Sequence, residues 1–111
     1  MKTLRLLPLI LLAACARLEL KVVNCSGAPV KQIEIRSPAG NIVLPVLDEG
    51  ASHIQVLKLK SGGDINVNYS NAQGQQLFTS SAISLRPGDS GFVLLSITAK
   101  GTLDSLDGRK K

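Results

Sequence analysis

The chain has 111 residues, with 13 lysines and arginines against 8 aspartates and glutamates, and only 3% of its residues are aromatic. That length suits one domain with a modest core and is too short for two. Three of the bases stand at the extreme C-terminus, and residues 18–108 hold seven bases and eight acids. The composition therefore argues against nucleic-acid binding, which needs clustered bases and aromatic platforms, and the shortage of aromatics also disfavours sugar binding.

The first 15 residues have the layout of a secretory signal. Lys2 and Arg5 give a positive start, residues 6–12 form an apolar run, and two small residues precede Cys15. The apolar run is too short to cross a bilayer as a helix. We therefore expect a targeting segment that is removed from the mature protein.

The sequence Leu12-Ala13-Ala14-Cys15 resembles the lipobox of bacterial lipoproteins: a branched apolar residue, two small residues and a cysteine. This resemblance implies cleavage between Ala14 and Cys15 and covalent acylation of Cys15. Two or three acyl chains form a stable membrane anchor where one would not. Because Ala16 is not an aspartate, the resemblance also implies the outer membrane, with the domain facing the periplasm.

Two other interpretations of this segment stay open. Ala14-Cys15-Ala16 also fits the small-x-small site of ordinary signal peptidase, which would release a soluble domain starting at Arg17. In the third interpretation, Cys15 is a buried residue of an uncleaved helix. The order of charge, apolar run and lipobox favours the lipoprotein.

The predicted domain organisation is a signal peptide at 1–14, a lipidated anchor and short tether at 15–17, a β-sandwich at 18–103 and a polar basic tail at 104–111. At about 3.3–3.6 Å per residue, the tether reaches only around 10 Å. We therefore expect the domain to lie against the membrane surface. The basic tail either contacts anionic headgroups or is a solvated end.

Apolar and polar residues alternate along most of the mature chain, as they do in β-strands that are buried on one face. The expected strand segments are 18–22, 32–36, 42–47, 52–60, 65–69 and 92–98. Pro45 predicts that its segment is an edge strand or bends there. A change of phase after Val56 predicts a bulge. Residues 92–97 are apolar except for Ser96, which predicts a central strand that is covered on both faces.

Turn signals rich in Gly, Pro, Asn, Asp and Ser separate these segments at intervals of about 10 residues. The pattern predicts an all-β fold, a small antiparallel β-sandwich of about seven strands. The sequence leaves immunoglobulin-like and transthyretin-like topologies both open. No segment after residue 17 has helical periodicity.

Cys25 is left without an intramolecular thiol partner after cleavage at either site, because Cys15 is then acylated or gone. A free thiol in an oxidising compartment is buried, serves redox chemistry, or forms a disulfide between two chains. Burial is the favoured interpretation, since free cysteine is among the most buried residue types. A dimer through Cys25 is the second.

Little in the sequence points to catalysis or to a cofactor. His53 is the only histidine; it stands beside Ser52 and near Asp48 and Glu49, but nothing marks a nucleophile elbow. One histidine and one free thiol do not make a transition-metal site, and the Asp89 turn lacks the oxygen ligands of a calcium loop. We expect no enzyme activity, no metal and no cofactor beyond the lipid on Cys15.

The remaining prediction is a membrane-anchored envelope lipoprotein that acts as a non-catalytic protein-interaction or assembly module with an envelope protein partner. The alternative is a periplasmic inhibitor, immunity or exclusion lipoprotein that neutralises an incoming enzyme, phage or plasmid. Its binding loop would be Arg86, Pro87, Gly88 and Asp89, which is otherwise a plain turn. The apolar segment 42–47 is a second candidate contact if it lies at an edge.

Overall fold

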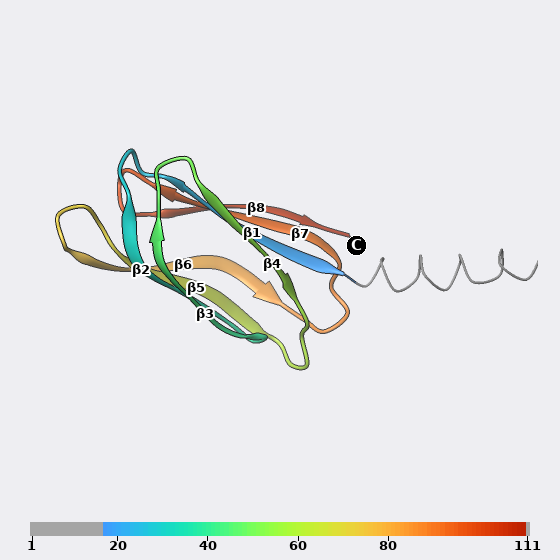
Figure 1. Cartoon of the computed structure of the whole chain (residues 1–111). Coiled ribbons are helices and arrows are strands. Elements are labelled where there is room, and N and C mark those ends of the chain that lie inside the picture. The colour runs from blue at the N-terminus through green and yellow to red at the C-terminus, as the bar shows by residue number, and fades with distance from the viewer. Residues whose placement is uncertain (1–16, 111) are drawn as a thin grey trace, which may run out of the picture.

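The computed structural model describes residues 17–110, and Ala82 by its backbone only. These residues form an all-β sandwich of two four-stranded sheets, with no helix in the described part of the chain (Figure 1). The strands are β1 (Leu18–Cys25), β2 (Val30–Ser37), β3 (Gly40–Leu47), β4 (Ser52–Leu57), β5 (Gly63–Ser70), β6 (Gln76–Leu85), β7 (Gly91–Thr98) and β8 (Leu103–Arg109). The predicted all-β sandwich is confirmed, with eight strands in place of about seven.

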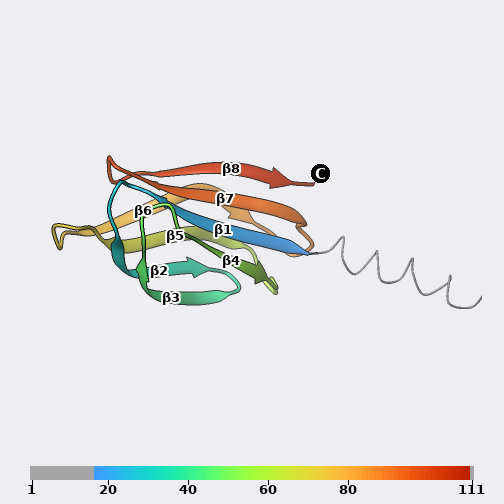
Figure 2. The same cartoon turned by 45° about the horizontal axis from the view of Figure 1, so that its top comes forward.

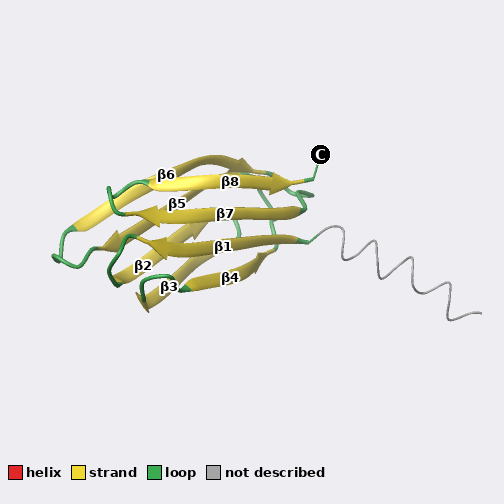
Figure 3. Cartoon of the chain, turned by 90° about the horizontal axis from the view of Figure 1, so that it is seen from above, coloured by secondary structure: helices red, strands yellow, loops and turns green. Residues whose placement is uncertain are grey.

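The strands are divided between the sheets in a way that decides the topology. Sheet A has the order β4-β1-β7-β8 and sheet B has the order β3-β2-β5-β6 (Figure 3). An immunoglobulin sandwich keeps its first two strands in one sheet, whereas here β1 and β2 lie in different sheets. Of the two topologies that the sequence leaves open, the transthyretin-like one remains.

One strand pair departs from the expected antiparallel arrangement. β1 pairs with β7 in parallel, from Leu18 opposite Gly91 to Cys25 opposite Thr98. The two strands are far apart in the chain, so no hairpin imposes the opposite direction on them. The other neighbouring pairs that the structure describes are antiparallel.

The core lies between the sheets and consists of the alternate, inward-facing residues of the strands. β1 contributes Leu18, Leu20 and Val22, which are all at most 1% exposed. The other buried apolar residues are Val30, Ile33, Ile35, Leu47, Leu57, Ile65, Val67, Tyr69, Ile83, Leu85, Val93, Leu95 and Ile97. Period-two alternation therefore predicts the core correctly for most strands.

The two long sides of the sandwich differ. On one side the edge strands β6 and β8 are joined, since Ser105 Oγ donates to the Ser81 carbonyl at 3.3 Å and Arg109 donates to the Ser84 carbonyl at 2.6 Å. On the other side, an open groove is lined by residues that include Ile42 of β3 and Gln55 of β4. Figure 2 shows the ribbons of these two edge strands at this side of the sandwich.

Three details of the predicted strands are corrected. β8 ends at Arg109, so the sandwich continues past the expected boundary at 103, and most of the predicted tail 104–111 is a strand paired with β7. β4 pairs with β1 in unbroken register, so Val56 lies outward without a bulge. β7 is central but covered on one face only, because Phe92 is 47% exposed.

Bulges occur elsewhere, where the sequence gives no clear sign of them. The pairing of β2 with β5 shifts between Lys31 and Glu34, and Gln32 there has a φ of 51°. The neighbouring ladder has no partner pair at Pro45, which lacks the amide hydrogen that a ladder needs. Pro45 therefore lies in an edge strand, as predicted.

Candidate functional site

The sandwich has two ends, and we name them by the direction of β1. The proximal end is where β1 begins; it contains Arg17, the connections 58–62 and 86–90, and Lys110. The Gly91 amide donates to the Arg17 carbonyl at 3.0 Å, and the Lys110 amide donates to the Ser90 carbonyl at 2.9 Å. The distal end contains the connections 26–29, 48–51, 71–75 and 99–102. Figure 1 shows that the C-terminal strand ends beside the start of β1.

The predicted partner loop lies at the proximal end and is fixed by internal hydrogen bonds. Asp89 accepts a hydrogen bond from the Arg86 amide at 2.9 Å and another from Arg109 at 2.9 Å. Arg109 also binds both carboxylate oxygens of Asp107, at 2.9 and 2.6 Å. The Arg86 amide bond, followed by the charged Arg109 hydrogen bond, lowers the pKa of Asp89 despite its partial burial. Pro87 and Gly88 are exposed at the tip of the loop. The loop is therefore a turn that the hydrogen bonds of Asp89 hold at its base.

The outer face of sheet A carries a row of apolar side chains. Ile54 in β4, Leu94 in β7 and Leu106 in β8 fall in one register row, in which Lys21 of β1 stands between Ile54 and Leu94. Ile54 is 57% and Leu106 is 56% exposed. Phe92 lies one row away, opposite Glu19 and Gly108. Phe92, Leu94 and Leu106 are neighbours on β7 and β8, while Glu19 and Lys21 of β1 separate them from Ile54 in β4. Exposed apolar side chains grouped on a sheet face are typical of a binding surface.

The outer face of sheet B is polar by comparison. Glu34 and Arg36 of β2 stand opposite Asn68 and Asn66 of β5, as the alternation predicts. Phe78 in β6 is 71% exposed, and in the edge strand β3 Val43 is 69% and Val46 is 47% exposed. On sheet B, polar residues of β2 and β5 separate Val43 from Phe78. On sheet A, Leu94 and Leu106 stand opposite each other on neighbouring strands, so we take the outer face of sheet A as the candidate docking surface.

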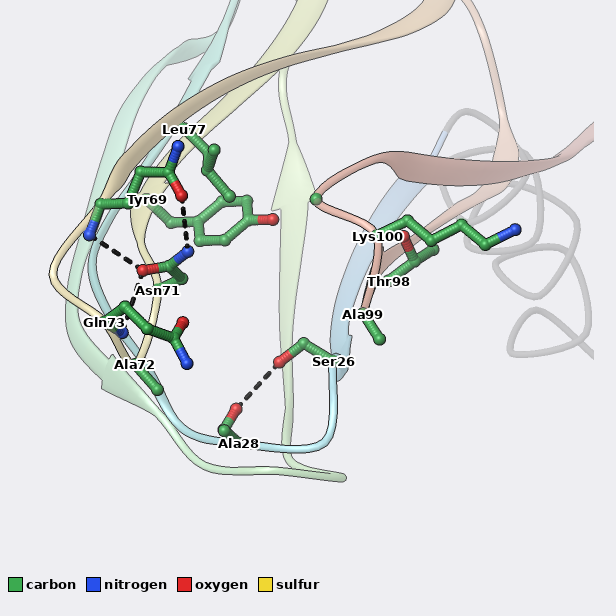
Figure 4. Close-up of a pocket in the computed structure, with 12 residues that line it drawn as sticks. Ser26, Ala28, Tyr69, Asn71, Ala72, Gln73, Leu77, Thr98, Ala99 and Lys100 are labelled. Atoms are coloured by element: carbon green, nitrogen blue, oxygen red, sulfur yellow. Dashed lines mark hydrogen bonds between the residues drawn. The ribbon is translucent and has the colours of Figure 1, made fainter.

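A polar pocket opens at the distal end, between the turn 71–75 and the turn 99–102 (Figure 4). Its volume is about 380 Å³, and its lining includes Ser26, Tyr69, Gln73 and Lys100. Tyr69 is 1% exposed, and burial raises the pKa of its hydroxyl. Figure 4 shows the Tyr69 hydroxyl directed toward the β7–β8 turn. Sequence reasoning did not find this pocket, because its members come from three separate turns.

The catalytic set considered from the sequence is not assembled. Ser52 and His53 are neighbours in β4, so their side chains point to opposite faces of the sheet. His53 contacts Gln55 Oε1 at 3.3 Å, while Asp48 and Glu49 are exposed in the distal connection. Among residues 17–110, no group of three or more His, Cys, Asp or Glu side chains could hold a metal ion.

Cys25 is exposed and free, so the favoured interpretation that it is buried is wrong. The alternation of β1 gives the reason: Leu20, Val22 and Asn24 point inward, and Cys25 falls on the outward phase at the end of the strand. The buried residue at this point is Asn24, which the sequence analysis did not identify. A disulfide between two chains stays a prediction.

The predicted segment 42–47 has a mixed environment in β3. Ile42 and Leu44 pack against the core, while Val43 is 69% and Val46 is 47% exposed. The expected signal peptide, the cleavage site after Ala14 and the acylated Cys15 lie outside the described residues. Within residues 17–110, no helix is long and apolar enough to cross a membrane.

Comparison with known proteins shows a similar fold without a family. No family model and no curated protein matches this chain in sequence. An NMR structure of a protein from Eubacterium rectale is similar, with a TM-score of 0.55 at 12% sequence identity. The match covers 86% of this chain and 92% of that chain. At this identity the similarity shows the fold alone.

Proposed function

We propose that this protein is a lipid-anchored envelope lipoprotein of bacteria, with its sandwich serving as a non-catalytic protein-interaction module. The lipobox-like sequence that ends at Cys15 supports the anchor. The scattered positions of His53, Asp48 and Glu49 favour a binding role over catalysis. The outer membrane, with the domain in the periplasm, is the proposed location.

The partner docks on the outer face of sheet A, and the apolar row is the observation that carries this proposal. Ile54, Leu94 and Leu106 lie on three of the four strands, and Lys21 supplies a charge within the row. With strands about 4.8 Å apart and eight residues long, the face measures on the order of 500 Å². A standard interface takes roughly 800 Å² from each partner, so the partner also contacts surface beyond this face.

The proposed inhibitor alternative has less support, because its loop Arg86–Asp89 is held from within by Asp89 and Arg109. A turn held in this way can still bind, but the Asp89 carboxylate already has partners inside the domain. The identity of the captured partner separates the two functions: a resident envelope protein supports assembly, and an incoming enzyme or phage protein supports inhibition.

Site-specific photo-crosslinking in intact envelopes tests the docking face. A photoreactive phenylalanine derivative replaces Leu106 on sheet A, or Asn68 on sheet B as the matched control. We expect an adduct of one mass from position 106 and none from position 68, and Leu94→Glu in the first protein should abolish it. Equal adducts from both faces, or none from sheet A, would reject the proposed surface.

The anchor has its own test. The intact mass of the protein extracted from envelopes, beside that of Cys15→Ala, should show a chain that begins at Cys15 and carries acyl mass. A chain that begins at Arg17 without lipid would reject the anchor and leave the docking face to be judged by crosslinking.

A further inference from the structure

The loops at the two ends of the sandwich carry opposite charge. Those of the proximal end hold five bases and one acid; the bases are Arg17, Lys58, Lys60, Arg86 and Lys110. Those of the distal end hold one base, Lys100, and two acids, Asp48 and Glu49. The basic end is the end at which β1 begins, and therefore the end nearest to Cys15 along the chain.

The basic charges of the proximal end face solvent. The five side chains belong to exposed residues. The single acid of these loops, Asp89, forms an ion pair with Arg109 at 2.9 Å and accepts a hydrogen bond from the Arg86 amide. Arg17 lies 3.9 Å from Glu19, a long contact between exposed groups that adds little. Most of the positive charge is thus available to an outside partner.

The chain length between Cys15 and the sandwich sets the distance to a membrane. Only Ala16 and Arg17 separate Cys15 from Leu18, which allows about 10 Å in extended form. Leu57, the residue before Lys58, pairs with Leu18, so Lys58 stands beside the start of β1. The Debye length at physiological salt is about 8 Å. These bases are therefore held where an anionic membrane surface attracts them.

From this arrangement we infer that the proximal end docks on anionic phospholipid headgroups, with the sandwich standing on that end. The inference rests on the proposed acylation of Cys15. The strands then run away from the membrane, the distal pocket faces the periplasm, and the outer face of sheet A stays free for the protein partner. The basic residues of the proximal end set the orientation of the sandwich on the membrane, whereas the acyl chains on Cys15 attach the protein to it.

Chemical labelling of the lysine amines in the intact protein tests the orientation of the sandwich on the membrane. The lipidated full-length mature protein is placed in vesicles of phosphatidylcholine alone or with phosphatidylglycerol, and labelled with a water-soluble amine reagent. Lys58, Lys60 and Lys110 report the proximal end; Lys31 and Lys100 serve as the built-in control at the distal end. We expect the three proximal lysines to react several-fold more slowly in anionic vesicles only, and 1 M salt should remove the difference because it shortens the Debye length to about 3 Å.

A pair of variants separates charge from position. Lys58→Gln with Lys60→Gln should return Lys110 to the rate measured in zwitterionic vesicles, since each base near an anionic surface contributes about fivefold to docking. Lys31→Gln with Lys100→Gln should leave the labelling of Lys110 unchanged. Equal rates at both ends, or protection that does not depend on lipid charge, would overturn the inference. The acyl mass measured on the same sample shows separately whether the anchor itself has failed.

Discussion

The side-chain amide of Asn24 in β1 donates a hydrogen bond of 2.9 Å to the carbonyl oxygen of Leu47, at the end of β3 in the opposite sheet. The same amide donates to the Ala28 carbonyl at 2.7 Å, and the Ser26 amide donates to Asn24 Oδ1 at 3.0 Å. Asn24 is 0% exposed. One buried side chain therefore joins the two sheets and the turn between β1 and β2.

Asn24→Ala should lower the free energy of unfolding by about 3 kcal/mol. The substitution removes the amide's bond to the Leu47 carbonyl and the acceptor of the Ser26 amide, while the Ala28 carbonyl keeps its bond from the Ser26 hydroxyl. An unsatisfied buried polar group costs about 1–3 kcal/mol. Urea unfolding measures the loss. Asn41→Ala, at an exposed position of β3, is the control and should change stability by less than about 0.5 kcal/mol. A loss below about 1 kcal/mol for Asn24→Ala would mean that water replaces the amide.

Gly108→Ala should destabilise the sandwich by about 1 kcal/mol, because the new methyl group would meet the ring of Phe92. The ring would have to turn across the outer face of sheet A. In a Phe92→Ala background the same change should be neutral or slightly stabilising, since alanine is favoured over glycine in a strand. A double-mutant cycle by chemical denaturation measures this coupling. Equal costs in both backgrounds would show that the ring is not the obstacle.

Asp89→Asn should lower stability at pH 7 by about 1–2 kcal/mol, through the weakened bonds to Arg109 and the Arg86 amide. The pKa of Asp89 is lowered in the fold, so its contribution is complete above the unfolded value of about 3.9 and is lost as the pH falls through the folded pKa. The difference between the two proteins should therefore shrink as the pH falls below about 3.9. Unfolding curves at several pH values provide the test, and a constant difference would contradict it.

Tyr69 gives the opposite dependence on pH. Burial raises the pKa of its hydroxyl in the folded protein, whereas the unfolded chain ionises near the ordinary value of about 10. Above that value the unfolded state loses its proton first, so stability should fall as the pH rises. Tyr69 is the single tyrosine and there is no tryptophan, so phenolate absorbance near 295 nm reports this residue alone. Ionisation at pH 10 without loss of structure would refute the prediction.

Cys25 should react with a water-soluble thiol reagent in the folded protein, because its residue is exposed. We expect a labelling rate close to that of the urea-unfolded chain, and no reaction at this position in Cys25→Ser. Mass spectrometry gives the site and the rate. Protection of native Cys25 under reducing conditions would show that another surface covers it, as in a dimer of two chains.

The alternation of residues predicts the core and the strand count closely, but it cannot assign strands to sheets. In β1, Leu18, Leu20 and Val22 appear as a buried face in the sequence and in the structure. The parallel pairing of β1 with β7 has no local signal, because strands with no hairpin between them pair through contacts distant in the chain. The division of β1 and β2 between the two sheets, which excludes the immunoglobulin-like topology, likewise depends on contacts that are distant in the chain.

The candidate docking face was hidden by the assumption that apolar residues point inward. Ile54 and Val56 suggested a bulge, and Phe92 suggested a strand covered on both faces, yet all three face outward from regular strands. The type of an apolar residue does not show whether it lies in the core or on the surface. The register of its strand decides which face of the sheet it occupies. The burial of Asn24 is not predicted either, because an asparagine beside a turn is expected to be exposed. Only its hydrogen-bond partners in the structure show why it is buried.

The parallel pair at the centre of sheet A has a consequence for the order of assembly. Leu18 finds its place beside Gly91 only after most of the chain has been made. The hairpins β2–β3 and β5–β6 are local in sequence and can form earlier, whereas β1 pairs with β4 and β7, which are both distant in the chain. Sheets that depend on such distant contacts fold slowly. Both neighbours of β1, the strands β4 and β7, come later in the chain and are joined to it by no hairpin. Sheet A is therefore completed after the hairpins of sheet B, and it is the half of the sandwich whose formation limits the rate of folding.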